Sequence, residues 1–172
     1  MKIDLNEIAL KPVPEADIDT SVEGDELAGV NAGSFTAEKV EPFVLKCEKG
    51  VGDVFSICGN TVISGHMPCD RCLEDTPVSV EVDIDRSFPV IDDQIVEDID
   101  DPLSALSEGV LDVCGLLAEE VLMELPVKVL CNADCKGLCP ICGKNRNIVE
   151  CDCDREVLDP RMQKFLDVFK EV

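Results

Sequence analysis

The sequence predicts an α+β fold: an antiparallel sheet that can curl toward a barrel, a packed helix, and a C-terminal zinc-ribbon-like module with a terminal helix. Three observations predict it. Residues 78–85 alternate between apolar and polar, residues 113–125 repeat apolar side chains at helical spacing, and residues 131–153 contain six cysteines. Alternation is typical of a half-buried antiparallel strand, and apolar residues at i, i+3 and i+4 are typical of a helix.

Size and composition fit one domain, or one domain with a small addition. The chain has 172 residues and is 45% hydrophobic, which is enough for a core. With six Phe and neither Tyr nor Trp, it has few platforms on which single-stranded nucleic acid can stack. The first residues are acidic rather than signal-like, and no run approaches the roughly 18 apolar residues of a membrane span. We therefore expect a cytoplasmic protein whose thiols stay reduced.

The formal net charge of −22 comes from one part of the chain. Residues 126–172 carry eight Lys or Arg and eight Asp or Glu, which balance, whereas residues 1–125 carry 7 minus 29, or −22. The simpler interpretation is a well-solvated acidic surface. Because an acidic surface repels phosphate, any RNA contact is expected within residues 126–172, and the larger part favours a protein partner.

The first third of the chain is expected to hold short strands behind an arm. Residues 1–33 combine a possible short strand at residues 3–8 with prolines and many acids, so we interpret them as an arm and loop. Residues 34–48 are mostly strand-compatible, residues 50–53 form a turn signal, and residues 54–57 and 61–63 suit further short strands.

A tight turn at residues 68–72 leads into the most regular strand of the chain. Its apolar face carries Val78, Val80, Val82 and Ile84, and its polar face carries Ser79, Glu81, Asp83 and Asp85. This alternation predicts a strand buried on one face. The acidic residues 92–101 are expected to form a loop.

Two helices are expected, one on each side of the cysteine-rich segment. Asp112 is a suitable N-cap for apolar residues that recur over 113–125, and Pro126 ends this helix. The second helix begins at Asp159-Pro160, with aspartate as the cap and proline in the first turn. Its apolar stripe, expected to dock on its own domain, contains Met162, Phe165, Leu166 and Phe169.

These elements divide the sequence into three parts. Residues 1–33 are an extended N-terminal arm, and residues 34–126 are a β-rich body with a helix. Residues 127–172 are a cysteine-rich metal module with a C-terminal amphipathic helix. The boundaries lie where composition changes, after the acid-rich start and at the helix-ending proline.

The cysteines are the most specific feature of the sequence. Eight of the eleven form four closely spaced pairs: Cys69/Cys72, Cys131/Cys135, Cys139/Cys142 and Cys151/Cys153. A two-residue gap turns two thiolates to the same side, and structural zinc prefers four soft ligands in a tetrahedron. Disulfide bridges are the alternative, but they belong to secreted proteins. The sequence therefore predicts one or two structural zinc ions.

Two arrangements of these pairs remain open. The preferred arrangement gives two four-thiolate sites. They are Cys139/Cys142 with Cys151/Cys153, and Cys69/Cys72 with Cys131/Cys135. The alternative takes one site from the six C-terminal cysteines and leaves the other thiols free. Four cations near the ligands are expected to offset the charge of the thiolates: Lys136, Lys144, Arg146 and Arg155.

The remaining sequence argues against an enzyme. A reactive dithiol at Cys69 and Cys72 needs a lowered thiol pKa, usually at the start of a helix, but this pair leads into a strand. His66, the only histidine, is interpreted as a hairpin residue rather than a ligand. No base accompanies a nucleophile, and no glycine-rich phosphate loop is present. Three isolated cysteines are interpreted as buried inert thiols: Cys47, Cys58 and Cys114.

Three strings in the sequence carry a family resemblance. They are CKGLCPICGKNRN at residues 135–147, Cys151-Asp152-Cys153, and the upstream Cys69-Asp70-Arg71-Cys72-Leu73. Together they resemble the bacterial YceD family, and the resemblance extends from residue 35 to the end of the chain. One departure is Arg146, where the family pattern has leucine.

The resemblance implies a process rather than a reaction. Members of the YceD family are implicated in the accumulation of large-subunit ribosomal RNA, which implies an accessory factor of ribosome assembly without catalytic residues. The implied partners are ribosome-assembly proteins or large-subunit ribosomal RNA, with no membrane and no small-molecule substrate. Two alternatives stay open: a zinc-stabilised protein-interaction module outside ribosome biogenesis, and a thiol oxidoreductase that uses Cys69 and Cys72.

Overall fold

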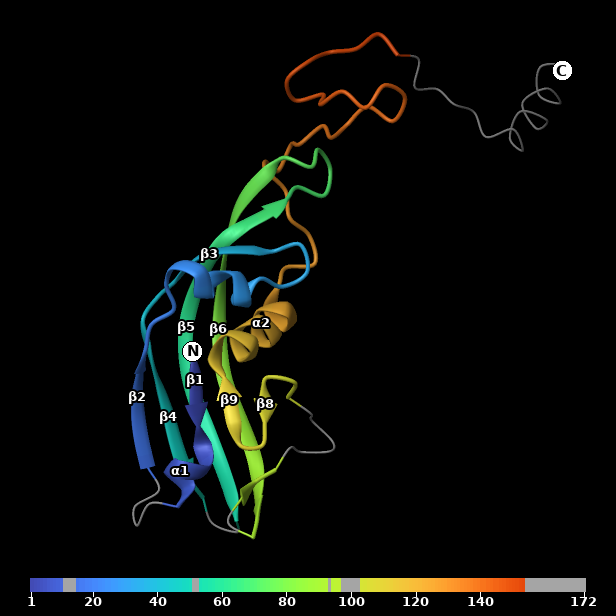
Figure 1. Ribbon diagram of the computed structural model, residues 1–172. Helices are drawn as coiled ribbons and strands as arrows, with labels where there is room; N and C mark the ends of the chain where they lie inside the picture. The colour runs from blue at the N-terminus through green and yellow to red at the C-terminus, as the bar shows by residue number, and fades with distance from the viewer. Residues whose placement is uncertain (11–14, 51–52, 93, 97–102, 154–172) are drawn as a thin grey trace, which may run out of the picture. The chain divides into compact units, whose positions relative to one another are not determined.

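A computed structural model describes most of the chain (Figure 1). The described residues are 1–10, 15–50, 53–92, 94–96 and 103–153. Several expectations fall on residues outside this set. They are part of the arm (11–14), part of the turn at 50–53 (51–52), parts of the acidic loop (93 and 97–101), Arg155, and the helix from Asp159.

Contacts divide the chain into two compact units. Unit 1 comprises Met1–Pro68 and Asp75–Val129, and unit 2 comprises Cys69–Glu74 and Leu130–Val172. The arm, body and module expected from the sequence are divisions of the sequence alone. The division after residues 33 and 126 stays a prediction.

Unit 1 is built on an antiparallel sheet, which has six strands within the described residues. The strand order is β2-β4-β5-β6-β7, and β3 pairs with β5. The bounds are β2 Glu15–Thr20, β3 Thr36–Val40, β4 Phe43–Lys49, β5 Val54–Pro68, β6 Asp75–Ile91 and β7 Gln94–Ile95. Figure 1 shows β2, β4, β5 and β6 side by side as the long strands of this sheet.

The expected alternation along β6 is confirmed. Val80, Val82 and Ile84 are buried, while the carboxylates between and beside them are exposed. The strand-compatible residues 34–48 form two strands, β3 and β4, with Pro42 between them. Proline has no backbone N–H to donate to a ladder, so it suits this break.

The prediction of two short strands at residues 54–57 and 61–63 was wrong. The structure has a single strand, β5, that pairs with β6 along its whole length. Gly59 interrupts the sequence pattern but not the strand. Glycine suits this position because a Cβ there would lie 2.9 Å from the carbonyl oxygen of Val44. A glycine inside a strand marks such a close approach of two backbones.

A second, three-stranded sheet in unit 1 joins the N-terminus to the segment before the main helix. Its order is β1-β9-β8, and its bounds are β1 Lys2–Asp4, β8 Leu106–Ser107 and β9 Val110–Asp112. The strand expected at residues 3–8 ends early, because α1 (Leu5–Ala9) begins there. The Asp4 side chain accepts from the N–H of Glu7 at 3.2 Å and so caps this helix. Farther along, the 3₁₀-helix η1 spans Gly24–Val30.

The main helix, α2, spans Val113–Glu124, and its expected start is confirmed. The Asp112 side chain caps it by accepting from the N–H of Cys114 at 3.2 Å. One buried residue of α2 is charged: Glu120 accepts from Nε of Arg86 on β6 at 2.7 Å. No helix in the described part of the chain is long and apolar enough to cross a membrane.

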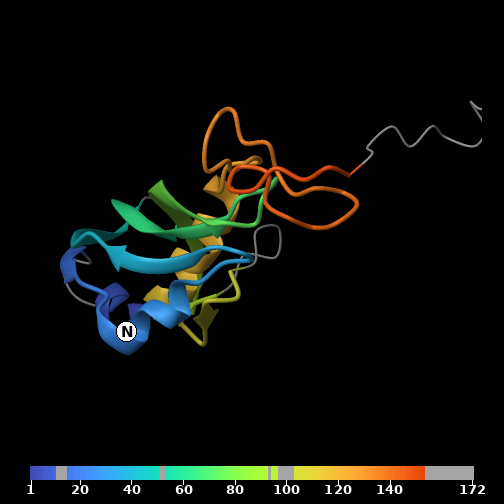
Figure 2. The ribbon, with the colours of Figure 1, turned by 90° about the horizontal axis from the view of Figure 1, so that it is seen from above.

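The core of unit 1 lies on one side of the curved main sheet. In Figure 1, α1, α2 and the β1-β9-β8 sheet lie in front of that sheet, and Figure 2 shows the same layering from above. The largest fully buried side chains of the sheet include Leu45, Phe55 and Ile57, and they join α2 residues such as Leu117 in one cluster. The predicted α+β class, with a curved antiparallel sheet and a packed helix, is confirmed.

Candidate metal centre

Eight cysteines gather in two groups within unit 2. The first tetrad is Cys69, Cys72, Cys131 and Cys135, and the second tetrad is Cys139, Cys142, Cys151 and Cys153. Within each tetrad the four sulfur atoms all lie within 4.8 Å of one another. These are the two groups of the preferred arrangement from the sequence. That they bind metal stays a prediction.

The sulfur separations suit a zinc ion. A regular tetrahedron with Zn–S bonds of about 2.3 Å places its sulfur atoms roughly 3.8 Å apart. In the first tetrad, Cys69 and Cys135 have sulfur atoms 3.9 Å apart, and those of Cys72 and Cys131 are 3.5 Å apart. Four thiolates form a closed, soft donor set, which fits structural zinc.

Each tetrad contains a knuckle with the same backbone hydrogen bonds. The N–H of Leu73 donates to the carbonyl of Cys69 at 2.9 Å, and the N–H of Gly143 donates to the carbonyl of Cys139 at 2.8 Å. In both knuckles the N–H of the first cysteine also donates to the carbonyl five residues later, at 2.9 and 2.8 Å. Leu73 and Gly143 both have positive φ, 61° and 70°. Glycine adopts this conformation readily, whereas leucine rarely does.

Arg71 connects the first knuckle to the segment that carries Cys135. Its carbonyl accepts from the N–H of Leu138 at 2.9 Å, and its Nη1 donates to the carbonyl of Cys135 at 2.8 Å. Gly137 makes this approach possible, because a Cβ there would lie 2.9 Å from the Arg71 carbonyl oxygen. Sequence reasoning assigned no role to Arg71 or Gly137. The available signal was a glycine between two closely spaced cysteines.

Asn147 connects the two tetrads. It lies in the loop that closes the second tetrad, yet its Nδ2 donates to Sγ of Cys135 in the first tetrad at 3.2 Å. Its Oδ1 accepts from the N–H of Lys136 at 2.8 Å. The hydrogen bond from Asn147 is the main cause that lowers the pKa of Cys135. Sequence reasoning missed this residue, since nothing in its spacing shows that it reaches a thiol.

Backbone donors favour the thiolate form of one cysteine in each tetrad. A backbone hydrogen bond from Cys131 is the main cause that lowers the pKa of Cys69 to about 6. A backbone hydrogen bond from Cys142 has the same effect on Cys139, whose pKa is also about 6. Thiolates are the ligand form of cysteine, so each tetrad has a thiol prepared for a cation.

Another thiol in each tetrad retains its proton. The hydrogen bond with the Cys72 side chain raises the pKa of Cys131 to about 12, and that with Cys142 raises the pKa of Cys153 to about 12. Closely packed thiols cannot all ionise without a cation, because like charges repel. A divalent metal would displace these protons.

The tetrads differ in burial. In the first, Cys69, Cys72 and Cys135 are buried, and Leu130 and Leu138 pack against them. In the second, only Cys139 is buried, and Cys142 is exposed. Two of the cations that were expected near the ligands, Lys136 and Arg146, line the same surface hollow as Cys151.

The other cysteines and His66 belong to unit 1 and are not members of either tetrad. The Nδ1 atom of His66 lies 3.0 Å from Oε1 of Glu38, as suits a hairpin residue. Cys47 and Cys114 are buried, and Cys58 is half-buried. Burial raises the pKa of Cys47 to about 11, in accord with an inert thiol.

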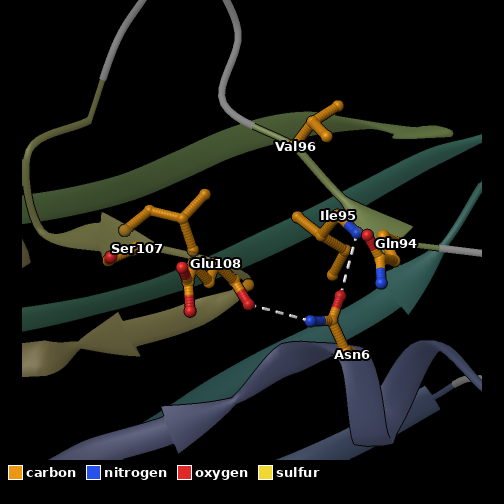
Figure 3. A pocket seen from close by; sticks show the side chains of 8 residues that line it. Asn6, Gln94, Ile95, Val96, Ser107 and Glu108 are labelled. Atoms are coloured by element: carbon orange, nitrogen blue, oxygen red, sulfur yellow. Dashed lines mark hydrogen bonds between the residues drawn. The ribbon is translucent and has the colours of Figure 1, made fainter.

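A hollow of about 680 Å³ in unit 1 is organised by Asn6 (Figure 3). The Asn6 side chain accepts from the N–H of Ile95 at 2.9 Å and donates to the carbonyl of Glu108 at 3.0 Å. A Cβ at Gly109 would lie 2.1 Å from the Asn6 amide nitrogen. Both ends of the Asn6 amide are used within the fold, so this side chain connects α1 to β7 and to the turn between β8 and β9.

The chain is similar to known proteins over a range that includes the cysteines of both tetrads. The family model "Large ribosomal RNA subunit accumulation protein YceD" matches residues 57–169, a range that includes both tetrads. The chain is 26% identical to YlbN of Bacillus subtilis (strain 168) over 176 residues, which cover 99% of this chain and 98% of YlbN. It is 27% identical over 126 residues to a protein of Mycobacterium leprae (strain TN), covering 72% of this chain and 57% of that protein.

A plant protein with a descriptive name is also similar over a short range. The large ribosomal RNA subunit accumulation protein YCED homolog 1, chloroplastic, of Arabidopsis thaliana is 37% identical over 49 residues. These cover 28% of this chain and 15% of the plant protein. No solved structure is significantly similar to this chain.

Proposed function

This chain belongs to the YceD family, and on that basis we propose that it is a non-enzymatic accessory factor for the accumulation of large-subunit ribosomal RNA and for ribosome assembly. The family match over residues 57–169 carries the proposal. The printed name of the Arabidopsis relative supports the same process. The proposed place of action is the cytoplasm.

Two structural zinc ions, one in each tetrad, are part of the proposal. A closed four-thiolate site leaves no coordination position for water or substrate, so the metal would act as a crosslink. In the first tetrad, Cys69 and Cys72 would be joined to Cys131 and Cys135, which come from a distant part of the sequence. The hydrogen bonds from Arg71 and Asn147 would hold these ligands in place.

The proposed partners are based on the distribution of charge along the chain. Residues 1–125 carry the whole excess of −22, so contacts there would be with protein. Residues 126–172 are balanced, and Lys136, Lys144 and Arg146 lie among the ligands of unit 2. Contact with large-subunit ribosomal RNA would therefore use this second segment.

The lowered pKa of Cys69 favours a thiol oxidoreductase as a second candidate. Against it, Cys69 and Cys72 lie beside two further thiols in a metal-like tetrad. An oxidoreductase would turn over a disulfide substrate, and Cys72→Ser would abolish the activity. We expect the zinc-loaded protein to show no such turnover.

The proposed function is tested by depleting the protein and separating ribosomal particles on sucrose gradients. A deficit of large subunits is expected, and the wild-type chain should restore them. Cys114→Ser, which changes a thiol outside both tetrads, is the matched control and should also restore them. Cys139→Ser should restore them less well. Normal profiles after depletion would contradict the proposed function.

A further inference from the structure

The outer face of the main sheet, opposite the core, is not covered by any described element of unit 1. All the packed elements lie on the other side of the sheet (Figures 1 and 2). The outward positions follow from the strand register and from burial. They include Glu15, Asp17 and Asp19 of β2, Val44, Lys46 and Glu48 of β4, Cys58, Asn60 and Val62 of β5, and Glu81, Asp83 and Asp85 of β6.

A hollow of about 790 Å³ lies on this face. It forms where two strands leave β5: the β4 ladder ends at Lys46 and Cys58, and the β3 ladder begins at Ile63. The lining residues include Val44, Lys46, Asn60, Asp83 and Asp85. The hollow therefore has polar and apolar walls, and two carboxylates of β6 form part of them.

The carboxylates of β6 have no cationic partner among the described residues. Other acids of unit 1 are paired with cations, such as Glu120 with Arg86 and Glu41 with Lys39. Glu81, Asp83 and Asp85 are exposed and make no ion pair in the described part of the chain. The outward positions named above carry seven acids and one lysine.

The spacing of these acids argues against a metal ion. Within the described residues, the tetrads of cysteines are the only groups of three or more potential ligands that converge closely enough for one ion. Glu81, Asp83 and Asp85 stand two residues apart on a strand, which separates them by roughly 7 Å. An extended polypeptide presents every second side chain on one face with the same period. The row therefore matches a peptide with cations at alternate positions.

Two exposed valines add an apolar component to the face. Val44 is 39% exposed and Val62 is 37% exposed. Lysine and arginine bury their hydrocarbon stems against apolar surface while their charged ends reach carboxylates. Ribonucleic acid is disfavoured at this face because its phosphates would meet the acids.

We propose that the outer face of the main sheet binds an extended, lysine- and arginine-rich segment of a partner protein. The segment lies along β6, with alternate cations beside Glu81, Asp83 and Asp85 and their stems near Val62. This proposal deepens the proposed function, on which it rests, by naming the chemical class of one partner.

The test uses the full-length, zinc-loaded chain and a labelled twelve-residue peptide of alternating arginine and threonine. Fluorescence anisotropy measures the Kd at low salt. The triple variant Glu81→Gln/Asp83→Asn/Asp85→Asn is expected to weaken binding about tenfold, since each exposed ion pair contributes modestly. Asp83→Lys adds a single repulsive charge at the same row and should also weaken binding, with circular dichroism confirming that both variants are folded.

A matched control removes the same number of charges elsewhere in unit 1. Glu23, Asp25 and Glu124 are exposed and lie outside the outer face. The variant Glu23→Gln/Asp25→Asn/Glu124→Gln should bind the peptide within about twofold of wild type, because the remaining charge effect is general and screened. Equal weakening in both triple variants would overturn the proposal, and so would absence of peptide binding.

A labelled twelve-residue RNA distinguishes the other class of partner. Little binding is expected, and RNA binding that the β6 triple variant abolishes would overturn the proposal. These outcomes are separable from those of the sucrose-gradient experiment. A large-subunit deficit without peptide binding would contradict only this inference, and peptide binding with normal gradients would contradict only the proposed function.

Discussion

Each of the two tetrads contains a knuckle, but the tetrads differ in the sequence separation of their ligands and in their burial. In the first, Cys72 and Cys131 are 59 residues apart in the sequence, and most of the thiols are buried. The second lies within residues 139–153 and is more exposed. A crosslink across a longer loop removes more entropy from the unfolded chain, by about 1–2 kcal/mol here on the loop-closure model. The same local chemistry should therefore stabilise the protein unequally at its two positions.

The largest expected difference concerns the loss of one ligand from each tetrad. Cys135→Ser should lower the melting temperature by roughly 10 °C, and Cys151→Ser by about half as much. The reason is that Cys135 belongs to the buried, long-range crosslink. Differential scanning calorimetry of the zinc-loaded variants measures both shifts. Equal shifts would remove the distinction between the tetrads.

The two tetrads should lose their metal ions to a chelator at different rates. With excess chelator, we expect the exposed second tetrad to lose its ion about tenfold faster than the first, because its sulfur atoms are accessible without opening a packed cluster. Native mass spectrometry over time should show a persistent one-zinc species. In Cys151→Ser only the slow phase should remain. A single phase in the wild type would contradict unequal protection.

Proton release should be similar at the two tetrads. At pH 7, Cys131 and Cys153, with pKa values of about 12, carry protons that zinc must displace. As the pH falls through 6, Cys69 and Cys139 also become protonated, so more protons are released per ion and the affinity for zinc falls more steeply. Titration calorimetry in buffers of different ionisation enthalpy counts these protons. A constant number between pH 5 and 7 would be the contrary result.

The smallest expected change in stability concerns the positive-φ position of each knuckle, which is leucine in the first tetrad and glycine in the second. Leu73 has a φ of 61° and is mostly exposed, so Leu73→Gly should stabilise the protein by about 1 kcal/mol. Gly143→Leu should destabilise it by a similar amount, since Gly143 has the same conformation. Urea denaturation of the zinc-loaded proteins measures both. Destabilisation by Leu73→Gly would show that the Leu73 side chain makes contacts that matter more than its backbone strain.

Local patterns were readable from the sequence. The alternation along β6 and the cap at Asp112 depend on neighbouring residues, so they could be predicted. Pair spacing and ligand number favoured the grouping of the cysteines into two tetrads, because four thiolates suit one tetrahedral ion, but they left a single site as an alternative. The family resemblance rested on the strings that contain these cysteines, at residues 69–73, 135–147 and 151–153.

Features that depend on distant contacts could not be predicted. Gly59 continues a strand because of a neighbouring backbone, and Glu120 is buried because Arg86 lies opposite it. Asn147 is a thiol donor only because the loop of the second tetrad reaches Cys135 of the first. In each case the decisive partner is far away in the sequence or lies on another element.

The most direct test of two unequal metal centres is the zinc content of the full-length chain purified without chelator. Native mass spectrometry should find two zinc ions per chain in the wild type. Cys151→Ser should retain one ion, held by the first tetrad. Finding no zinc in the wild type, with all eleven thiols free to react, would contradict the account.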